Sequence, residues 1–382
     1  MRTVLKVVVV LALVVLVAQV GVFFLYAATS CQLPSPSISP ADAEKVDELR
    51  VLVLSDIHIL GKRRRSWLER AWIDWQVRMT ALSAFQVHRP ELVLVLGDQL
   101  DEGGLPTPQR DWEEYVARFK HVTSSLRSLK TLYLVGNHDT SFGRYMETLE
   151  IARFERAFGP SNFVEYVGDH AFIGVNTMAL DSDVTRADVK AQAEDFLASI
   201  DTEQLRASTA HGSVVLLTHL PLHRPDDMRC GDHRARESGH VTYEHPSFQY
   251  AAHHHVLSEA LSARLLSTIA PDVVLSGHTH AWCEFAGHSD GVREFTVPAL
   301  SWGQRPDPSY ALLGLRSRRA ASEHAAVDGA MSAAVRCSVP NEHGVFALYA
   351  LTVMGLVLAR LCRGWCLPAH HRTSKGTWTK TQ

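Results

Sequence analysis

The chain has 382 residues, of which 46% are hydrophobic and 21% are charged. That balance excludes a disordered polymer, a collagen-like fibre and a small disulfide-stapled module. With 38 Lys and Arg residues against 41 Asp and Glu residues, the net charge of −3 gives no reason to expect a nucleic-acid partner, because such proteins usually carry a basic excess.

The chain opens with an apolar segment. Residues 7–28 carry no charge, and Arg2 and Lys6 precede them. About 20 apolar residues cross a bilayer as a helix, whereas the apolar region of a cleaved signal peptide is only about 7–15 residues long. We therefore expect residues 1–28 to form a cytosolic stub and a transmembrane helix, with a cleaved signal peptide as the alternative. A linker rich in Ser and Pro is expected at 29–48.

Short apolar runs then alternate with helical patterns. Most runs are four or five residues long and rich in Val and Leu, which is typical of strands buried on both faces. The expected strands are 51–55, 92–96, 131–135, 172–176, 214–218, 273–276, 294–297 and 310–315, with a hairpin at 164–175. The expected helices are 67–88, 111–126, 149–158, 186–200 and 257–269. Residues 49–315 are thus predicted to form one α/β domain with two packed sheets.

A second apolar run lies near the C-terminus. Residues 316–343 are polar and rich in turn formers, which predicts a linker, and the apolar run 345–359 is followed by Arg360 and a basic tail. The run is short for a span, and a buried core helix is the alternative. Basic residues beyond both apolar segments favour cytosolic termini. We expect a second transmembrane helix at 344–361, a cytosolic tail at 362–382 and a lumenal or extracellular middle.

Four cysteines fall in that middle part, namely Cys31, Cys230, Cys283 and Cys337. An even number of cysteines can pair in an oxidising compartment, and the three possible connectivities are equivalent from the sequence.

Polar side chains follow five of the expected strands. Because the carboxyl ends of strands form the ligand crevice of open α/β sheets, these side chains should converge. Seven oxygen and imidazole donors without a thiolate are too many for one tetrahedral site and suit two divalent ions that share a carboxylate. They are Asp56, His58, Asp98, Asn137, His219, His278 and His280. Mn, Fe or Zn fits this donor set better than Cu(I), and such a pair of ions predicts hydrolysis of a phosphoester.

The motifs D-x-H, G-D-x-x-D, G-N-H-D, H-x-P and G-H-T-H occur in this order over residues 56–280. Together they resemble the calcineurin-like metallophosphoesterase superfamily. The resemblance implies an α/β fold with a two-sheet β-sandwich flanked by helices. It implies one metal on Asp56, His58, Asp98 and His280, and the other on Asp98, Asn137, His219 and His278. It also implies that His138 is the general acid and that Asp101 orients its imidazole.

A narrower group is similar over several outer segments. These are 67–68, 75–76, 98–103, 153–158, 219–224, 276–284 and 297–302. They resemble the secretory-pathway metallophosphoesterases that remove ethanolamine phosphate from the mannose of GPI anchors, whose members have a span at each end of the catalytic domain. The resemblance implies a GPI-anchored protein substrate and a lumenal catalytic domain in the ER, ER exit sites or Golgi. We expect the two divalent ions to be Mn²⁺, with Fe or Zn as the alternatives. Glu102 stands where the superfamily's protein phosphatases carry an Arg, which disfavours a protein phosphatase.

Two other functions compete with this interpretation. One is a membrane-bound metallophosphatase that acts on another lipid or on a nucleotide phosphoester. The other is a non-catalytic scaffold on the same fold, which the complete ligand set and His138 disfavour.

Several residues outside the motifs have alternative interpretations. Glu102, Trp282 and Trp302 are candidates for binding the ethanolamine cation, with supporting or core roles as the alternative. Arg224 either contacts phosphate or lies on the surface, and residues 253–255 are expected to form a loop or a helix cap.

Overall fold

The structure, a computed structural model, describes residues 9–11, 13–15, 17–33, 46–180, 184, 186–235, 249–288, 291–318 and 332–365. It divides into a larger unit, Val22–Glu342, and a smaller one composed of Met1–Gly21 and His343–Gln382. The expected cytosolic stub up to residue 8, the central part of the first linker and the tail from residue 366 lie outside the described residues.

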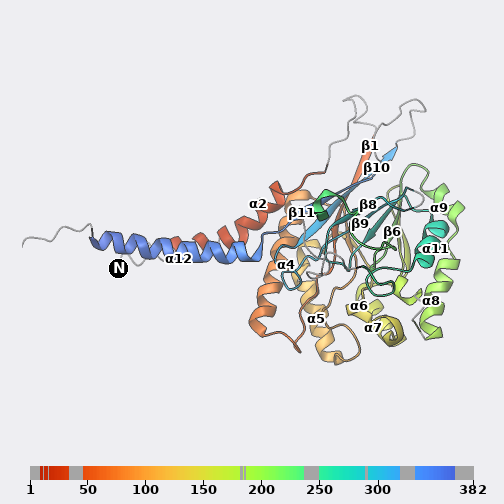
Figure 1. Ribbon diagram of the computed structural model, residues 1–382, viewed down its shortest axis with the longest axis horizontal. Coiled ribbons are helices and arrows are strands. Elements are labelled where there is room, and N and C mark those ends of the chain that lie inside the picture. Colours follow the sequence, from red (N-terminus) through yellow and green to blue (C-terminus); the bar gives the residue numbers. More distant parts are fainter. Residues whose placement is uncertain are drawn as a thin grey trace, which may run out of the picture. The chain divides into compact units, whose positions relative to one another are not determined.

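The larger unit is built on two sheets (Figure 1). The first has the strand order β11-β10-β1-β2-β3. In it β1, β2 and β3 are parallel, and β10 is antiparallel to both of its neighbours, β1 and β11. Its strands are β1 (Val46–Leu54), β2 (Leu92–Val95), β3 (Lys130–Tyr133), β10 (Ser309–Arg318) and β11 (Ser332–Ser338).

The second sheet has the strand order β4-β5-β6-β7-β9-β8, with parallel pairing from β5 to β9 and an antiparallel strand at each edge. Its strands are β4 (Phe163–Val167), β5 (His170–Gly174), β6 (Val214–Leu217), β7 (Val273–Ser276), β8 (Cys283–Phe285) and β9 (Arg293–Thr296).

Helices flank the two sheets. Figure 1 shows α4 (Trp67–His88) and α5 (Gln109–Val122) on one flank, and α8 (Ala187–Ala198), α9 (Thr202–Ser208) and α11 (Glu259–Ile269) on the other. Ser66 caps α4 and Ser258 caps α11, each by accepting a hydrogen bond from a main-chain N–H in the first turn. The short helix α6 (Asn137–Thr140) and α7 (Thr148–Phe158) follow β3.

The hydrophobic core lies between the sheets. Val51, Leu94, Val215, Leu275 and Phe295 contribute to it and are each 0% exposed. Strands covered on both faces need continuous apolar runs, which explains why these segments are so rich in Val and Leu. The predicted two-sheet α/β fold is confirmed.

The end of the N-terminal apolar segment belongs to the larger unit. There α2 (Val22–Thr29) packs on α4, and its Phe23 is 2% exposed. The Phe23 ring lies 5.4 Å from that of Trp75 and 5.9 Å from that of Trp302. Residues 22–29 are therefore packed into the domain as well as being apolar.

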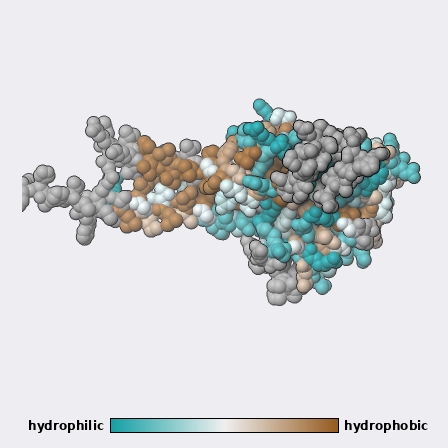
Figure 2. All heavy atoms as spheres, turned by 90° about the horizontal axis from the view of Figure 1, so that it is seen from above, coloured by the Kyte–Doolittle hydropathy of each residue, from teal (hydrophilic) through white to brown (hydrophobic). Residues whose placement is uncertain are grey.

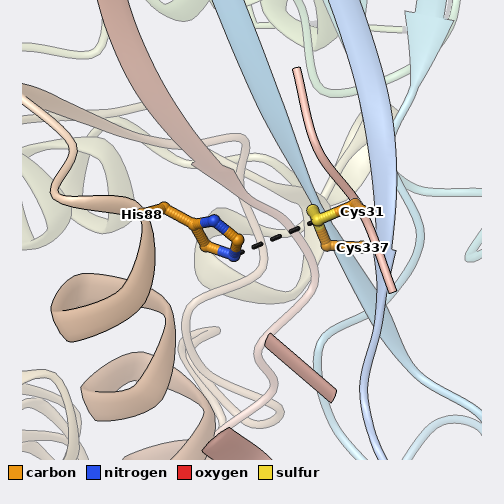
Figure 3. Close-up of side chains that lie close together, drawn as sticks. All are labelled: Cys31, His88 and Cys337. Atoms are coloured by element: carbon orange, nitrogen blue, oxygen red, sulfur yellow. Dashed lines mark hydrogen bonds between the residues drawn. A yellow bond between two sulfur atoms is a disulfide. The ribbon is translucent and has the colours of Figure 1, made fainter. Parts of the chain in front are cut away.

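Two disulfides pair the four cysteines as Cys31–Cys337 and Cys230–Cys283. The first joins the residues after α2 to β11, and His88 Nε2 lies 4.0 Å from Cys31 Sγ (Figure 3). Sulfur engaged in a disulfide is not a thiolate, so this His and Cys cluster is no metal site.

The first sheet extends beyond the C-terminal boundary expected at residue 315. β10 continues to Arg318, and β11 lies inside the segment expected to be a linker, where it pairs with β10 from Ser309↔Ser338 to Leu315↔Ser332. The β11 sequence mixes small, apolar and polar residues without alternation, so an edge strand there has no apolar periodicity to reveal it.

The two apolar ends differ in length. The helix Val9–Thr29 is long and apolar enough to cross a membrane, as an anchor or as a signal sequence. α12 (Glu342–Trp365) is a 24-residue helix, and its apolar part within the described residues, Glu342–Leu358, is shorter than a typical span. Figure 2 shows apolar side chains along these helices. A second transmembrane helix is thus not established by the fold.

We predict that Phe23→Ala lowers the free energy of unfolding by about 3–5 kcal/mol, because it leaves a cavity beside Trp75 and Trp302. Leu25→Ala, on the same helix at 57% exposure, is the control and should change it by less than about 0.5 kcal/mol. Denaturant unfolding of the full chain in detergent, followed by near-UV circular dichroism, measures both. Equal effects would contradict the packing of α2 on the domain.

Candidate dinuclear metal site

The predicted donors meet where the carboxyl ends of the strands in both sheets come together. Asp56 and His58 follow β1, Asp98 follows β2, and Asn137 follows β3. The second sheet supplies His219 after β6, and His278 and His280 after β7. Two sheets that present their strand ends on the same side therefore surround one site.

The main chain at these donors adopts an unusual conformation. Asp56, His58, Asp98, His278 and His280 have φ values of 49°, 47°, 52°, 69° and 56°. The left-handed region is uncommon for residues other than glycine and occurs most often for Asn, Asp and His. The strand therefore stops abruptly at each donor, and the turn directs the side chain into the site.

Two motif glycines leave room for these side chains. A Cβ atom at Gly136 would lie 2.2 Å from Asp98 Oδ1, and one at Gly277 would lie 2.1 Å from Ser55 Oγ and 2.8 Å from Asp56 Oδ2. Any larger residue would displace a donor carboxylate, which accounts physically for glycine before Asn137 and before His278.

One group of donors consists of Asp56, His58 and His280. The Oδ1 atom of Asp56 lies 3.3 Å from His280 Nε2 and 3.8 Å from His58 Nε2. Its Oδ2 atom accepts hydrogen bonds from the Ser55 hydroxyl at 2.5 Å and from the main-chain N–H of His278 at 2.9 Å. One carboxylate oxygen is thus held by the protein, and the other faces the imidazoles.

A second group consists of Asp98, Asn137, His219 and His278. His219 Nε2 lies 3.0 Å from Asn137 Oδ1, and the His219 and His278 ring centroids are 5.2 Å apart. The ligand atoms of Asp98, His219 and His278 all lie within 4.8 Å of one another.

Asp98 connects the two groups. Its Oδ2 atom lies 3.4 Å from His58 Nε2 and 3.4 Å from His219 Nε2. Its Oδ1 atom accepts a hydrogen bond from the main-chain N–H of His138 at 2.8 Å. Asp98 therefore has the position that a carboxylate shared by two ions requires.

Hydrogen bonds from the surrounding protein orient the imidazoles. His219 Nδ1 lies 2.8 Å from the Leu96 carbonyl, and His278 Nε2 lies 2.8 Å from the His254 carbonyl. An N–H that donates to a carbonyl leaves the other ring nitrogen free for a metal. His254 thus contributes to the site through its main chain, which no side-chain motif could have revealed.

Asp101 lies between two imidazoles. Its carboxylate Oδ1 is 3.4 Å from His58 Nδ1 and 3.8 Å from His138 Nδ1, while its main-chain carbonyl is 2.9 Å from His138 Nδ1. The expected orientation of His138 by Asp101 therefore runs through the main chain, and the carboxylate is nearer to His58.

Opposite charges counteract burial throughout the site. Burial lowers the pKa of an imidazole, but the adjacent carboxylates of Asp101 and Asp56 raise the pKa of His58 to about 10, and the Asp98 charge raises the pKa of His219 to about 9. Burial would likewise raise the pKa of Asp56 and Asp98, yet the neighbouring histidines hold both well below the ordinary range. The carboxylates are therefore ionised in the folded protein.

The donor set fits a pair of divalent ions. Asp56 Oδ1 and His58 Nε2 are buried without a hydrogen-bond partner, a costly arrangement that a cation between them would relieve. Oxygen and imidazole donors suit Mn, Fe or Zn. His58 also belongs to a group with Asp98 and His138, but His138 is largely exposed.

Several residues outside the motifs lie elsewhere than expected. Trp282 and Trp302 are each 5% exposed, the first in the core and the second stacked on Trp72, so neither binds a substrate cation. Arg224 is 1% exposed and bonded to Asp227, so it is neither on the surface nor at the site. The interpretation of residues 253–255 as a loop is confirmed, because they form a turn closed by the Ala252↔Val256 bridge.

The sequence profile of the family described as calcineurin-like phosphoesterase matches residues 49–282. The chain therefore belongs to the calcineurin-like phosphoesterase family and is a metal-dependent phosphoester hydrolase. Membership implies a dinuclear site for divalent metals, which the geometry above fits.

Within this family the chain is similar to proteins named Metallophosphoesterase 1. It is 30% identical to the one from Rattus norvegicus in an alignment 389 positions long, which covers 96% of this chain and 93% of the relative. It is 31% identical to that of Cricetulus griseus over 348 residues, 85% and 83% of the two chains. Among solved structures, a purple acid phosphatase from yellow lupin seeds is 13% identical with a TM-score of 0.44, covering 82% of this chain and 56% of its own.

We predict that Mn²⁺ binding to the metal-free protein releases protons. Metal ligation requires neutral imidazoles, and the raised pKa values keep His58 and His219 protonated at pH 7, so about two protons should leave on binding. Metal affinity should consequently rise with pH up to about 9–10 and fall as the pH is lowered. Titration calorimetry in buffers of different ionisation enthalpy counts the protons.

His121→Asn is the control for this titration, because His121 is exposed on α5 away from the motifs. It should leave the proton count unchanged, whereas His58→Gln should lower it. Metal binding without proton release would contradict the charge state assigned to the site.

Proposed function

We propose that the chain is a membrane-anchored, Mn²⁺-dependent phosphodiesterase that removes ethanolamine phosphate from the mannose of GPI anchors. The observation that carries the proposal is the position of Asp98. One of its carboxylate oxygens faces imidazoles of both donor groups, and the other accepts a hydrogen bond from the main-chain N–H of His138. The similarity to Metallophosphoesterase 1 over most of the chain supports the narrower assignment.

The proposed metal ligands are those of the two groups. One ion would be held by Asp56, His58, Asp98 and His280, and the other by Asp98, Asn137, His219 and His278. When bound, the two ions supply the Lewis acidity and the activated water of phosphoester hydrolysis.

His138 is the proposed general acid. Its side chain is 41% exposed, so it can reach a substrate, and its ring lies 4.6 Å from that of His58. Because Nδ1 faces the Asp101 carbonyl, Nε2 is the atom available to protonate the leaving oxygen. Asp101 positions this imidazole by its main chain and stabilises the neighbouring His58 by its carboxylate.

A cavity beside His138 can accept the leaving group. Its volume is about 870 Å³, and its lining includes Asp101, Asn137, His138, Arg63 and Tyr145. Cavities of this size bind small molecules and oligosaccharide fragments of similar bulk. Tyr145 is 65% exposed and lies under the Arg144 guanidinium, which presents a flat aromatic and polar surface to a substrate.

A membrane-held substrate agrees with the apolar helix Val9–Thr29. We propose that this helix is a retained anchor with the catalytic domain in the lumen of the ER, ER exit sites or Golgi, and that α12 is a second span with a cytosolic C-terminus. Tethering enzyme and substrate to one bilayer raises their effective concentration. The disulfides agree with an oxidising compartment.

We predict that His138→Asn lowers kcat about 10²–10⁴-fold toward a soluble phosphodiester, as loss of a general acid does, while Mn content is unchanged. Asp98→Ala should lower activity and Mn content together, because it removes the shared carboxylate. Steady-state kinetics with metal analysis of each purified variant separates the two roles. A His138→Asn variant with full activity would exclude the acid assignment.

We predict that cells lacking the protein accumulate ethanolamine phosphate on GPI glycans, measured by mass spectrometry of released glycans. Wild type should restore the normal content and His138→Asn should not. Unchanged glycans in the deletion cells, with the purified enzyme still active on other phosphodiesters, would point to a different lipid or nucleotide phosphoester as substrate.

A further inference from the structure

The first turn of α4 and the loop before it carry an exposed group of cationic and apolar side chains. Trp67 is 68% exposed and Leu68 is 62% exposed. Three consecutive arginines, Arg63, Arg64 and Arg65, precede them within the same short segment. We refer to Arg64, Trp67 and Leu68 as the α4 edge.

The two arginines beside Arg64 each form an ion pair with a carboxylate of the protein. Arg63 Nε lies 3.0 Å from Glu102 Oε2, and Arg65 Nη1 lies 2.7 Å from Glu69 Oε1. Arg64 itself is exposed. The α4 edge thus combines an exposed guanidinium with a large indole and a leucine side chain in water.

This composition fits the surface of a bilayer. Trp is enriched at the level of the lipid headgroups because its ring is apolar and its N–H is polar, and Arg binds lipid phosphate. Burial of one large apolar side chain is favourable by about 1.5–3 kcal/mol, so insertion of Trp67 and Leu68 into the bilayer surface would stabilise the contact between domain and membrane.

The packing of α2 on α4 shows toward which end of α4 the first residue of α2 lies. At the start of α2, Phe23 packs on Trp75, whereas Ala28 and Cys31 after it share a cavity of about 290 Å³ with His88. The two helices therefore run in the same direction. The apolar segment joins α2 at Val22, and this junction lies toward the end at which α4 begins.

Trp67 lies on that same side. It precedes Trp75 by two turns of α4, which at 1.5 Å per residue is about 12 Å beyond the level of Phe23. The end of α4 that carries the exposed Trp67 and Leu68 is thus the end toward which the chain junction at Val22 lies.

We propose that the α4 edge contacts the bilayer surface, with Trp67 and Leu68 at headgroup level and Arg64 on lipid phosphate. The proposal rests on retention of the apolar helix as an anchor. Because Arg63 lines the cavity beside His138, this contact holds the mouth of the cavity against the membrane. A substrate carried by the bilayer then reaches His138 without leaving the surface.

The test is tryptophan quenching by lipids brominated in the upper acyl chain. The full chain is reconstituted into nanodiscs of phosphatidylcholine and phosphatidylserine, with and without brominated lipid. Relative to wild type, Trp67→Phe should lose part of the bromine-dependent quenching. Trp112→Phe is the matched control, because Trp112 is 6% exposed under Arg153, and it should retain that quenching.

The charge contribution is tested in the same nanodiscs. Arg64→Glu should reduce the quenching assigned to Trp67, whereas Arg110→Glu, an exposed arginine on α5, should not. Both positions are exposed, so neither change is expected to unfold the domain.

The outcomes separate this inference from the proposed function. Equal quenching of wild type and Trp67→Phe, in protein whose intact mass shows the apolar helix retained, overturns the α4 edge contact alone and favours a protein partner for this surface. An intact mass that lacks the apolar helix overturns the anchor and the contact together. Hydrolysis of soluble phosphodiesters tests the metal site independently of either.

Discussion

Two buried carboxylates, Asp56 and Asp98, constrain the rest of this structure. They are 0% and 1% exposed, and an isolated carboxylate at such depth would cost several kcal/mol. The protein offsets that cost with imidazoles on one side and with donated hydrogen bonds on the other, from Ser55 and the main chain of His278 to Asp56 and from the main chain of His138 to Asp98. The hydrogen bonds that stabilise the two carboxylates therefore come from the same turns that carry the other candidate ligands.

The scaffold delivers these groups by ending its strands sharply. Five of the seven donors have left-handed main-chain conformations, which a fold tolerates only where the surrounding structure enforces them. Parallel strands bring successive turns to one edge of each sheet, and the two facing sheets together bring five such turns to the site. The same geometry leaves His138 exposed at the rim, beside the cavity, while Asp56, His58, Asp98 and His219 are buried.

The periphery connects this site to the end of the domain at which the apolar segment joins α2. α2 continues the apolar segment and is held to the domain by Phe23 and by the Cys31–Cys337 disulfide. α4 lies along α2, and the loop before α4 carries Arg63 into the cavity lining. A single helix pair thus relates the junction with the apolar segment, the exposed Trp67 and the mouth of the cavity beside His138.

The strands of the core and all seven donors could be predicted from the sequence, because buried strands require apolar runs and the donors follow them directly. Other features depend on contacts between residues far apart in the chain. The β11 strand has no apolar pattern and forms only because β10 offers it an edge, and Trp282, Trp302 and Arg224 are buried by distant segments. The orienting carbonyls of Asp101 and His254 carry no side-chain signature. Local pattern thus identified the seven donors that the fold brings together. Tertiary packing decided the disulfide pairing, the partners of each imidazole and the place of α2 in the domain, since these depend on distances that only the folded chain defines.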